Sequence, residues 1–180
     1  MKTLVELFKE KGFSYYQTDK GTCPHYYLEV YDKLFEPFQD KEINLFEVGY
    51  DLGGSCKLWA DYFSKAKIKA IDIRSYPKPT YSDRISLEVI NVNNITPNYF
   101  LNFLPDIVID DGSHKTQDQI HLVKSAYPML RSGGLILIED LIDIDKQKIE
   151  FEKIGIPFEI VDLRRSGGKI DDVLIIYRKS

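Results

Sequence analysis

Apolar residues in the first forty positions recur at the spacing of amphipathic helices. Residues 2–11 place their apolar side chains at Leu4, Val5, Leu7 and Phe8. Residues 24–38 do the same with Tyr27, Val30, Tyr31, Leu34 and Phe35. This period predicts two helices, the first ending at Gly12 and the second carrying Pro24 in its first turn. The polar stretch between them, residues 13–22, predicts a connecting loop.

From residue 43 onwards, short apolar runs alternate with helical stretches. The runs predict strands at 43–48, 68–73, 87–92, 106–110, 135–139, 158–162 and 173–178. The stretches between them predict helices at 54–63, 98–104, 116–130 and 145–154. Central runs such as 107–109 and 135–138 are apolar at every position, as expected of parallel strands covered by helices on both faces. The alternation therefore indicates a doubly wound α/β fold.

The last two strands are too close in sequence for a crossover helix between them. A glycine-containing turn around Gly167 and Gly168 is expected to join them as an antiparallel hairpin. A mostly parallel, seven-stranded sheet ending in such a hairpin is the Rossmann-like arrangement of class I methyltransferases. Ligands of such sheets bind at the carboxyl ends of the strands, so functional residues are expected just after each strand.

Length, charge and cysteine content narrow the class of protein. A chain of 180 residues suits one domain, here residues 1–180, with an N-terminal helical segment at 1–40 and a core at 41–180. A formal net charge of -4 argues against a nucleic-acid partner. Cys23 and Cys56 have no metal-binding spacing and are expected to be reduced thiols. With no signal peptide and no apolar run of membrane-spanning length, a cytoplasmic protein without a membrane partner is expected.

A glycine-rich loop follows the first predicted strand. It carries Glu47, Gly49, Gly53, Gly54 and Ser55, and the helix that follows offers free N–H groups to a carboxylate or phosphate. The spacing differs from G-x-G-x-x-G, and a carboxylate at the strand end would repel a pyrophosphate. It would instead attract the ammonium group of a methionine moiety. The loop thus favours S-adenosylmethionine, the alternative being a glycine turn without a ligand.

Two further strand ends fit a nucleoside. Asp72 ends the second strand about 20 residues after the glycine loop, where a carboxylate accepts hydrogen bonds from ribose hydroxyls. Asn91 and Asn93 follow the third strand, near the expected place of an adenine. Their amides suit its edge, although asparagine is also a common turn residue.

Four carboxylates end two strands that should be neighbours in the sheet. Asp110 and Asp111 follow the fourth strand, and Glu139 and Asp140 follow the fifth. Neighbouring strands lie about 4.8 Å apart, so these oxygen ligands can converge on Mg²⁺ or another hard divalent cation. His114, three residues after Asp111, is a candidate general base for a hydroxyl made more acidic by the metal. Turn formation and helix capping are the competing explanations for these residues.

The chain resembles the macrocin and mycinamicin sugar O-methyltransferase family from about residue 17 to its C-terminus. The matching stretches lie at 18–22, 47–55, 59–63, 71–73, 109–114 and 133–141, with the D-D-G-S-H and E-D-L elements the most specific. The resemblance implies methylation of a hydroxyl, commonly on a sugar, with a metal held by Asp111, Glu139 and Asp140 and with His114 as the base. It also implies that residues 18–20 close over the cofactor. The expected cofactor-binding residues are Thr18, Lys20, Glu47, Gly49, Gly53, Gly54, Ser55, Asp72, Asn91 and Asp110.

The hypothesis is therefore a metal-dependent O-methyltransferase for a sugar or another hydroxylated small molecule, with homo-oligomerisation left open. A protein that binds or cleaves S-adenosylmethionine without a methyl acceptor is the first alternative. A nicotinamide-dependent oxidoreductase is the second, because it shares the layout of strand, glycine loop and acidic residue. The aromatic residues Tyr15, Tyr16, Tyr26 and Tyr27 are candidates either for the acceptor pocket or for the core.

Overall fold

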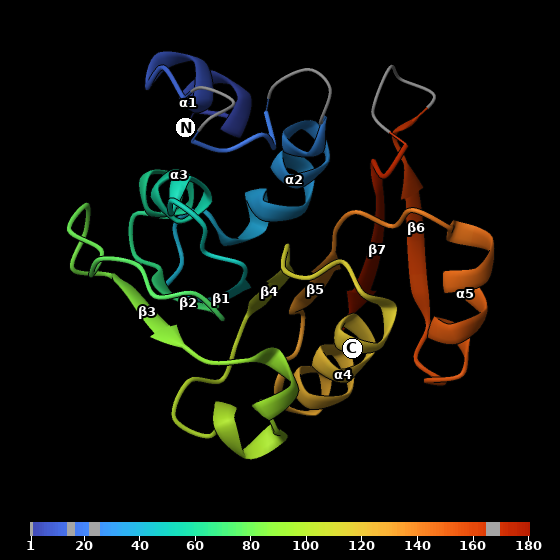
Figure 1. The fold of residues 1–180 in the computed structure, drawn as a ribbon. Coiled ribbons are helices and arrows are strands. Elements are labelled where there is room, and N and C mark those ends of the chain that lie inside the picture. Colours follow the sequence, from blue (N-terminus) through green and yellow to red (C-terminus); the bar gives the residue numbers. More distant parts are fainter. Residues whose placement is uncertain (1, 14–16, 22–25, 165–169) are drawn as a thin grey trace.

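A computed structural model describes residues 2–13, 17–21, 26–164 and 170–180. Its centre is one seven-stranded sheet in the order β3-β2-β1-β4-β5-β7-β6 (Figure 1). The strands are β1 (Asn44–Val48), β2 (Lys67–Asp72), β3 (Ile85–Val89), β4 (Ile107–Asp110), β5 (Leu135–Ile138), β6 (Phe158–Asp162) and β7 (Val173–Arg178). The doubly wound, mostly parallel sheet predicted from the sequence is confirmed.

Strands β1 to β5 are parallel to one another, whereas β7 is antiparallel to both of its neighbours. The predicted hairpin is confirmed, because β6 pairs with β7 from Phe158 opposite Tyr177 to Asp162 opposite Val173. Strand β7 is inserted between β5 and β6. Because β1, β2, β4 and β5 are parallel, their carboxyl ends lie along one edge of the sheet. The predicted joining turn, with Gly167 and Gly168, lies outside the described residues, as do Tyr15, Tyr16, Cys23 and Pro24.

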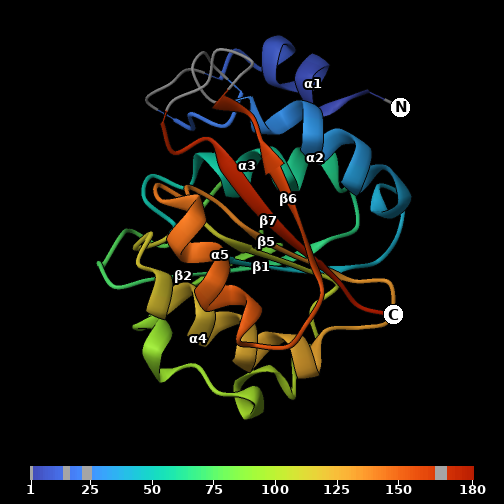
Figure 2. The ribbon, with the colours of Figure 1, turned by 90° about the vertical axis from the view of Figure 1, so that its right-hand side faces the viewer.

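Helices cover both faces of the sheet, as Figure 2 shows. One face carries α1 (Leu4–Glu10), α2 (Tyr27–Phe35) and α3 (Gly54–Tyr62), and the other carries α4 (Thr116–Ala126) and α5 (Ile144–Glu152). None of the helices in the described ranges combines the length and the apolar character that crossing a lipid bilayer requires.

The strand side chains alternate between two hydrophobic cores. In β5, Leu135 and Leu137 join the core beneath α1, α2 and α3, whereas Ile136 and Ile138 join the core beneath α4. Successive side chains of a strand point to opposite faces, so a strand that packs on both faces must be apolar throughout. This explains why the central strands were recognisable as uninterrupted apolar runs.

Short 3-10 turns account for most differences from the predicted helix boundaries. Residues 98–104 were predicted as a helix, but the structure has a 3-10 turn at Pro97–Phe100 instead. The predicted helix 116–130 ends as α4 at Ala126, and a 3-10 turn follows at Tyr127–Met129 because Pro128 has no N–H to donate. Similar turns lie at Glu36–Phe38, which contains Pro37, and at Val92–Asn94.

Candidate functional site

A cavity of about 760 Å³ opens at the carboxyl edge of the parallel strands. Its walls come from the loops after β1 to β5 and from the segment before α2. Many of the predicted site residues line it, namely Thr18, Gly49, Gly54, Ser55, Asp72, Asn91, Asp111, His114 and Asp140. Ligands of doubly wound sheets bind at this edge, so the cavity is the candidate site.

The glycines after β1 serve backbone packing as well as the turn. Gly49 and Gly53 have φ values of +93° and +72°, which favour glycine. A Cβ on Gly49 would lie 1.9 Å from the carbonyl oxygen of Asp111, and one on Gly54 would lie 1.6 Å from that of Gln17. These glycines were expected to admit a ligand close to the backbone. At Gly49 and Gly54 the close neighbour is instead another segment of the chain, which fixes the cavity wall.

Asp72 connects the glycine loop to the end of β2. Its Oδ2 accepts hydrogen bonds from the backbone N–H groups of Tyr50 at 2.9 Å and Asp51 at 3.2 Å, and its Oδ1 accepts one from Arg74. The carboxylate therefore has a structural role in the loop while it faces the cavity. Asn91 lies across the same cavity, where its Oδ1 accepts a hydrogen bond from the N–H of Asn93.

Glu47 is a buried carboxylate with one unpaired oxygen. Its Oε2 accepts hydrogen bonds from Cys56 Sγ and Trp59 Nε1, both at 3.2 Å. Its Oε1 has no hydrogen-bond partner in the part of the chain that the structure describes. Burial raises the pKa of the Glu47 carboxyl, although the nearby Lys20 opposes the shift. A buried, unpaired oxygen is a site for a hydrogen-bond donor, and an ammonium group supplies both the donor and the opposite charge.

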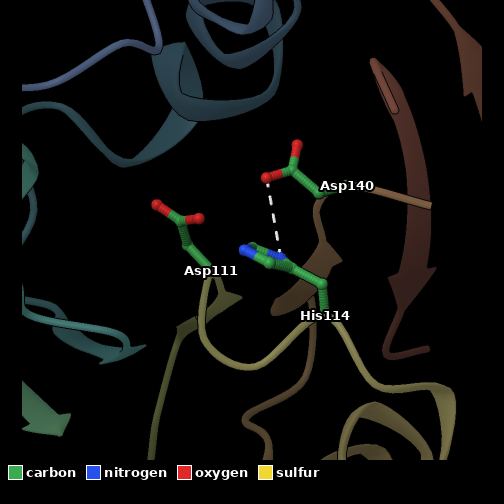
Figure 3. A group of neighbouring side chains, drawn as sticks. All are labelled: Asp111, His114 and Asp140. Carbon is green, nitrogen blue, oxygen red and sulfur yellow. Dashed lines mark ion pairs between the residues drawn. The ribbon is translucent and has the colours of Figure 1, made fainter. Parts of the chain in front are cut away.

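Three side chains converge in the wall of the cavity. One ligand atom from each of Asp111, His114 and Asp140 lies within 4.8 Å of the others. Figure 3 shows the imidazole of His114 between the two carboxylates, with Asp111 and His114 on the loop after β4 and Asp140 on the loop after β5. The distance from His114 Nδ1 to Asp140 Oδ2 is 3.6 Å, which suits an ion pair but exceeds a hydrogen bond.

The backbone conformation and the charge distribution are both unfavourable in this cluster. His114 and Asp140 have positive φ values of 55° and 59°, in a region that non-glycine residues adopt uncommonly and mostly at turns or functional sites. Burial, followed by repulsion from Asp111, raises the pKa of the Asp140 carboxyl. A cation or a proton brought to this cluster would relieve the repulsion, and carboxylates with an imidazole suit a divalent metal ion.

Behind the cavity, Lys20 and Glu139 form a buried ion pair. Lys20 Nζ lies 2.6 Å from Asp111 Oδ2 and 2.6 Å from Glu139 Oε2. Tyr31 donates its hydroxyl hydrogen to the other oxygen of Glu139, and Tyr27 donates to Asp140 Oδ1 at 2.6 Å. Lys20 was expected to bind the cofactor and Glu139 to bind metal, but neither lines the cavity.

The supporting role of the two tyrosines is not predictable from their helical spacing alone. Tyr27 and Tyr31 lie four residues apart on one face of α2 and were assigned there by their apolar period. Both rings are buried in the core, while both hydroxyls reach the carboxylates after β5. A pair of tyrosines at this spacing, rather than two phenylalanines, was the only signal in the sequence.

Asp110, Gly53 and Glu47, all expected to bind the cofactor, are also absent from the cavity wall. Asp110 is buried, and its Oδ1 accepts a hydrogen bond from the N–H of Gly112 at 3.2 Å. Its Oδ2 has no partner among the described residues, and burial raises the pKa of its carboxyl to about 7. Its contacts are those of a group beneath the site rather than in it.

The sheet order and the loops after β1, β2, β4 and β5 define the fold of class I S-adenosylmethionine-dependent methyltransferases. A solved methyltransferase of the mycinamycin biosynthetic pathway, in complex with Mg and SAH, superposes with a TM-score of 0.76 at 20% identity, over 99% of this chain and 55% of that one.

Sequence comparison confirms the resemblance to sugar O-methyltransferases. A demethylmacrocin O-methyltransferase of Streptomyces fradiae is 29% identical over 83% of this chain and 42% of its own length. An 8-demethyl-8-alpha-L-rhamnosyl tetracenomycin-C 2'-O-methyltransferase of Streptomyces olivaceus is 31% identical over 65% of this chain and 33% of its own length. The chain thus spans less than half the length of either relative. No protein-family model matches it.

Proposed function

We propose that the chain is an S-adenosylmethionine-dependent O-methyltransferase that uses a divalent cation and acts on a hydroxyl of a sugar or another hydroxylated small molecule. The observation that carries the proposal is the convergence of Asp111, His114 and Asp140 in the wall of one cavity. The same cavity is also lined by Asp72 and Asn91, the residues expected to meet a nucleoside.

The residues of the cavity suit S-adenosylmethionine along its length. Asp72 and Asn91 line the cavity, where Asp72 would accept hydrogen bonds from the ribose hydroxyls and Asn91 would meet the adenine. Glu47 is buried and does not line the cavity, and its unpaired oxygen would accept a hydrogen bond from the ammonium group. The cofactor supplies a methyl group on a positively charged sulfur. The chain's own task is to hold that sulfur in line with an acceptor oxygen at the Asp111 end of the cavity.

Asp111 and Asp140 would hold the divalent cation. Both line the cavity, and their side chains are 27% and 16% exposed, so each keeps an accessible oxygen. A bound cation lowers the pKa of a coordinated hydroxyl. His114 would be the base for the acceptor hydroxyl, and its Nε2, the ring nitrogen that does not face Asp140, is the atom that would accept the proton. Asp140, whose Oδ2 lies 3.6 Å from Nδ1, would stabilise the resulting imidazolium.

The acceptor class rests on the relatives, which are named for demethylmacrocin and for a rhamnosyl tetracenomycin. These names support a hydroxyl on a sugar that is part of a larger molecule. Methyl transfer to a weakly acidic hydroxyl requires a methyl donor, and it is helped by a metal and a base at the same place.

The test has two stages on the full chain. Calorimetric titration with S-adenosylmethionine and S-adenosylhomocysteine, with and without Mg²⁺, should show binding of both. A panel of rhamnosides and macrolide glycosides should then yield methylated product, with a loss of at least 100-fold in His114→Ala. His121→Ala is the matched control and should keep its activity, because His121, on α4, lies outside the cavity and contacts the carbonyl oxygen of Ile95. Failure to bind either cofactor would refute the proposal, and turnover without an acceptor would support the cleavage alternative.

A further inference from the structure

Asp118 lines the cavity but has no part in the reaction proposed above. It lies in the first turn of α4, four residues after His114, and is half-buried. A carboxylate in the wall of a ligand cavity is a hydrogen-bond acceptor for the part of the ligand that lies against it. The neighbours of Asp118 show which part of a nucleoside that is.

The carboxylate of Asp118 connects two loops of the site. Its Oδ2 accepts a hydrogen bond from Ser113 Oγ at 2.6 Å, in the loop after β4. Its Oδ1 accepts one from Asn93 Nδ2 at 2.9 Å, in the 3-10 turn Val92–Asn94 after β3. These two bonds lower the pKa of the Asp118 carboxyl, so the group is ionised near neutral pH. An ionised carboxylate accepts about four hydrogen bonds, so both oxygens keep room for a ligand.

The bond to Asn93 places Asp118 beside the expected position of the nucleobase. Asn91 and Val92, which directly precede Asn93, line the same cavity as Asp118. Asn91 is the residue expected to meet the adenine. A base held against the loop after β3 would therefore lie within reach of a carboxylate that comes from α4.

The amide of Asn91 offers a ligand the opposite kind of group. Its Oδ1 accepts a hydrogen bond from the N–H of Asn93 at 2.9 Å and caps the 3-10 turn. With the oxygen engaged in this way, the amide offers its Nδ2 hydrogens, which suit a ring nitrogen of a base. Adenine has ring nitrogens that accept and a 6-amino group that donates. The amide of Asn91 and the carboxylate of Asp118 match these two groups.

We propose that Asp118 selects the nucleobase of the cofactor: its carboxylate accepts a hydrogen bond from the 6-amino group, so that the chain prefers a 6-aminopurine to a 6-oxopurine. The inference rests on the proposed function for the presence of a nucleoside in the cavity. It assigns the amino group to α4, whereas the asparagines after β3 were the residues expected to meet the base.

The preference follows from the kind of group at position 6. A 6-oxopurine carries a carbonyl oxygen there, which is an acceptor. Facing Asp118, it would place two acceptors against each other, and the hydrogen bond to the charged oxygen would be lost. A site built to accept a hydrogen bond rejects an analogue that cannot donate it. A bond to a charged group is worth about 1.5–3 kcal/mol, which predicts a preference of at least tenfold.

The test compares two ligands by calorimetric titration of the full chain without metal or acceptor. The ligands are S-adenosylhomocysteine and S-inosylhomocysteine, in which an oxo group replaces the 6-amino group. The wild type should bind S-adenosylhomocysteine at least tenfold more tightly. Asp118→Asn should bring the ratio of the two Kd values to threefold or less, because its amide can accept from an amino group or donate to an oxo group.

Two further variants separate base selection from loop structure. Ser113→Ala removes one bond to Asp118 but keeps the carboxylate, so the preference should stay at least tenfold. Asp145→Asn is the matched control, because Asp145 also lies in the first turn of a helix, α5, but outside the cavity. It should bind both ligands as the wild type does. Circular dichroism and thermal melting check that each variant is folded.

Three results would overturn the role of Asp118. They are a wild-type preference below tenfold, a preference above threefold in Asp118→Asn, and a preference in Ser113→Ala that falls as far as in Asp118→Asn. The first of these needs no variant, so the inference can fail even if Asp118→Asn does not fold.

The outcome can be told apart from that of the proposed function. If S-adenosylhomocysteine binds without preference over the inosyl analogue, only the role of Asp118 is refuted. If the predicted preference is found but no acceptor is methylated, only the methyltransferase proposal is refuted. If neither ligand binds to the folded chain, both are refuted.

Discussion

Asp110 provides a quantitative test of how the site is built, because it is a buried carboxyl directly below the cavity. Burial raises its pKa from 3.8 to about 7, and the hydrogen bond from the N–H of Gly112 only partly offsets this. The difference corresponds to about 4 kcal/mol of destabilisation when the group is fully ionised. Asp110→Asn removes the charge and keeps an oxygen that can accept from Gly112.

The direction in which stability changes with pH follows from proton linkage. The folded chain binds this proton more tightly than the unfolded chain, so the contribution of Asp110 to stability is complete below about pH 4 and is lost as the pH rises toward 7. Between pH 5 and pH 8 the wild type should therefore lose about 2–3 kcal/mol from this group alone. Asp110→Asn should lack that loss, so its stability relative to the wild type should increase by the same amount over this range.

Urea unfolding at pH 5, 6, 7 and 8, with a chelator present, measures this difference directly. Asp40→Asn, at an exposed carboxylate, is the control and should differ from the wild type by less than about 0.5 kcal/mol at each pH. If the stability difference between Asp110→Asn and the wild type is the same at pH 5 and pH 8, the carboxyl ionises normally in the folded chain and the reasoning is wrong.

Two other predictions address the glycine loop and its carboxylate. Gly54→Ala should destabilise the fold by about 2–3 kcal/mol in urea unfolding, because its Cβ would lie 1.6 Å from the carbonyl oxygen of Gln17. Gly133→Ala, with a φ of +78° and open space around it, should cost only about 1 kcal/mol, and equal losses would contradict the packing argument. Glu47→Gln should weaken S-adenosylmethionine binding about 10- to 100-fold in calorimetry, the worth of a hydrogen bond to a charged group. Adenosine, which lacks the ammonium group, should bind the wild type and Glu47→Gln equally well. An equal loss of adenosine affinity would mean that Glu47 does not act through the ammonium group.

The central strands were predictable because each is buried on both faces. Val108 and Ile109, for example, are fully buried in opposite cores, so the run had to be apolar throughout. The third strand was predicted at 87–92 but lies at Ile85–Val89. It is an edge strand whose residues are mostly half-buried or exposed, so a purely apolar criterion placed it too late.

The carboxylates at this edge of the sheet were equally predictable from the sequence, because the carboxyl ends of parallel strands lie along the same edge. Asp72, Asp111 and Asp140 each follow a strand directly, and all three line the cavity. The hydrogen-bond and ion-pair partners of Glu139 could not be predicted from the sequence. Lys20 and Tyr31 lie 119 and 108 residues away along the chain, and neither periodicity nor spacing fixes which loop reaches across a sheet.

Unfavourable backbone conformations and buried charges cluster around the cavity. The described residues other than glycine that have positive φ are Asp51, His114 and Asp140, and each lines its wall. A left-handed backbone costs about 1–2 kcal/mol at such a residue, so it persists only where the surrounding structure enforces it. Nearby, the pair of Lys20 and Glu139 places opposite charges in a buried position that apolar residues would fill at lower cost. Because these costs fall at one edge of the sheet and not in the cores, they indicate that the edge is shaped for ligands.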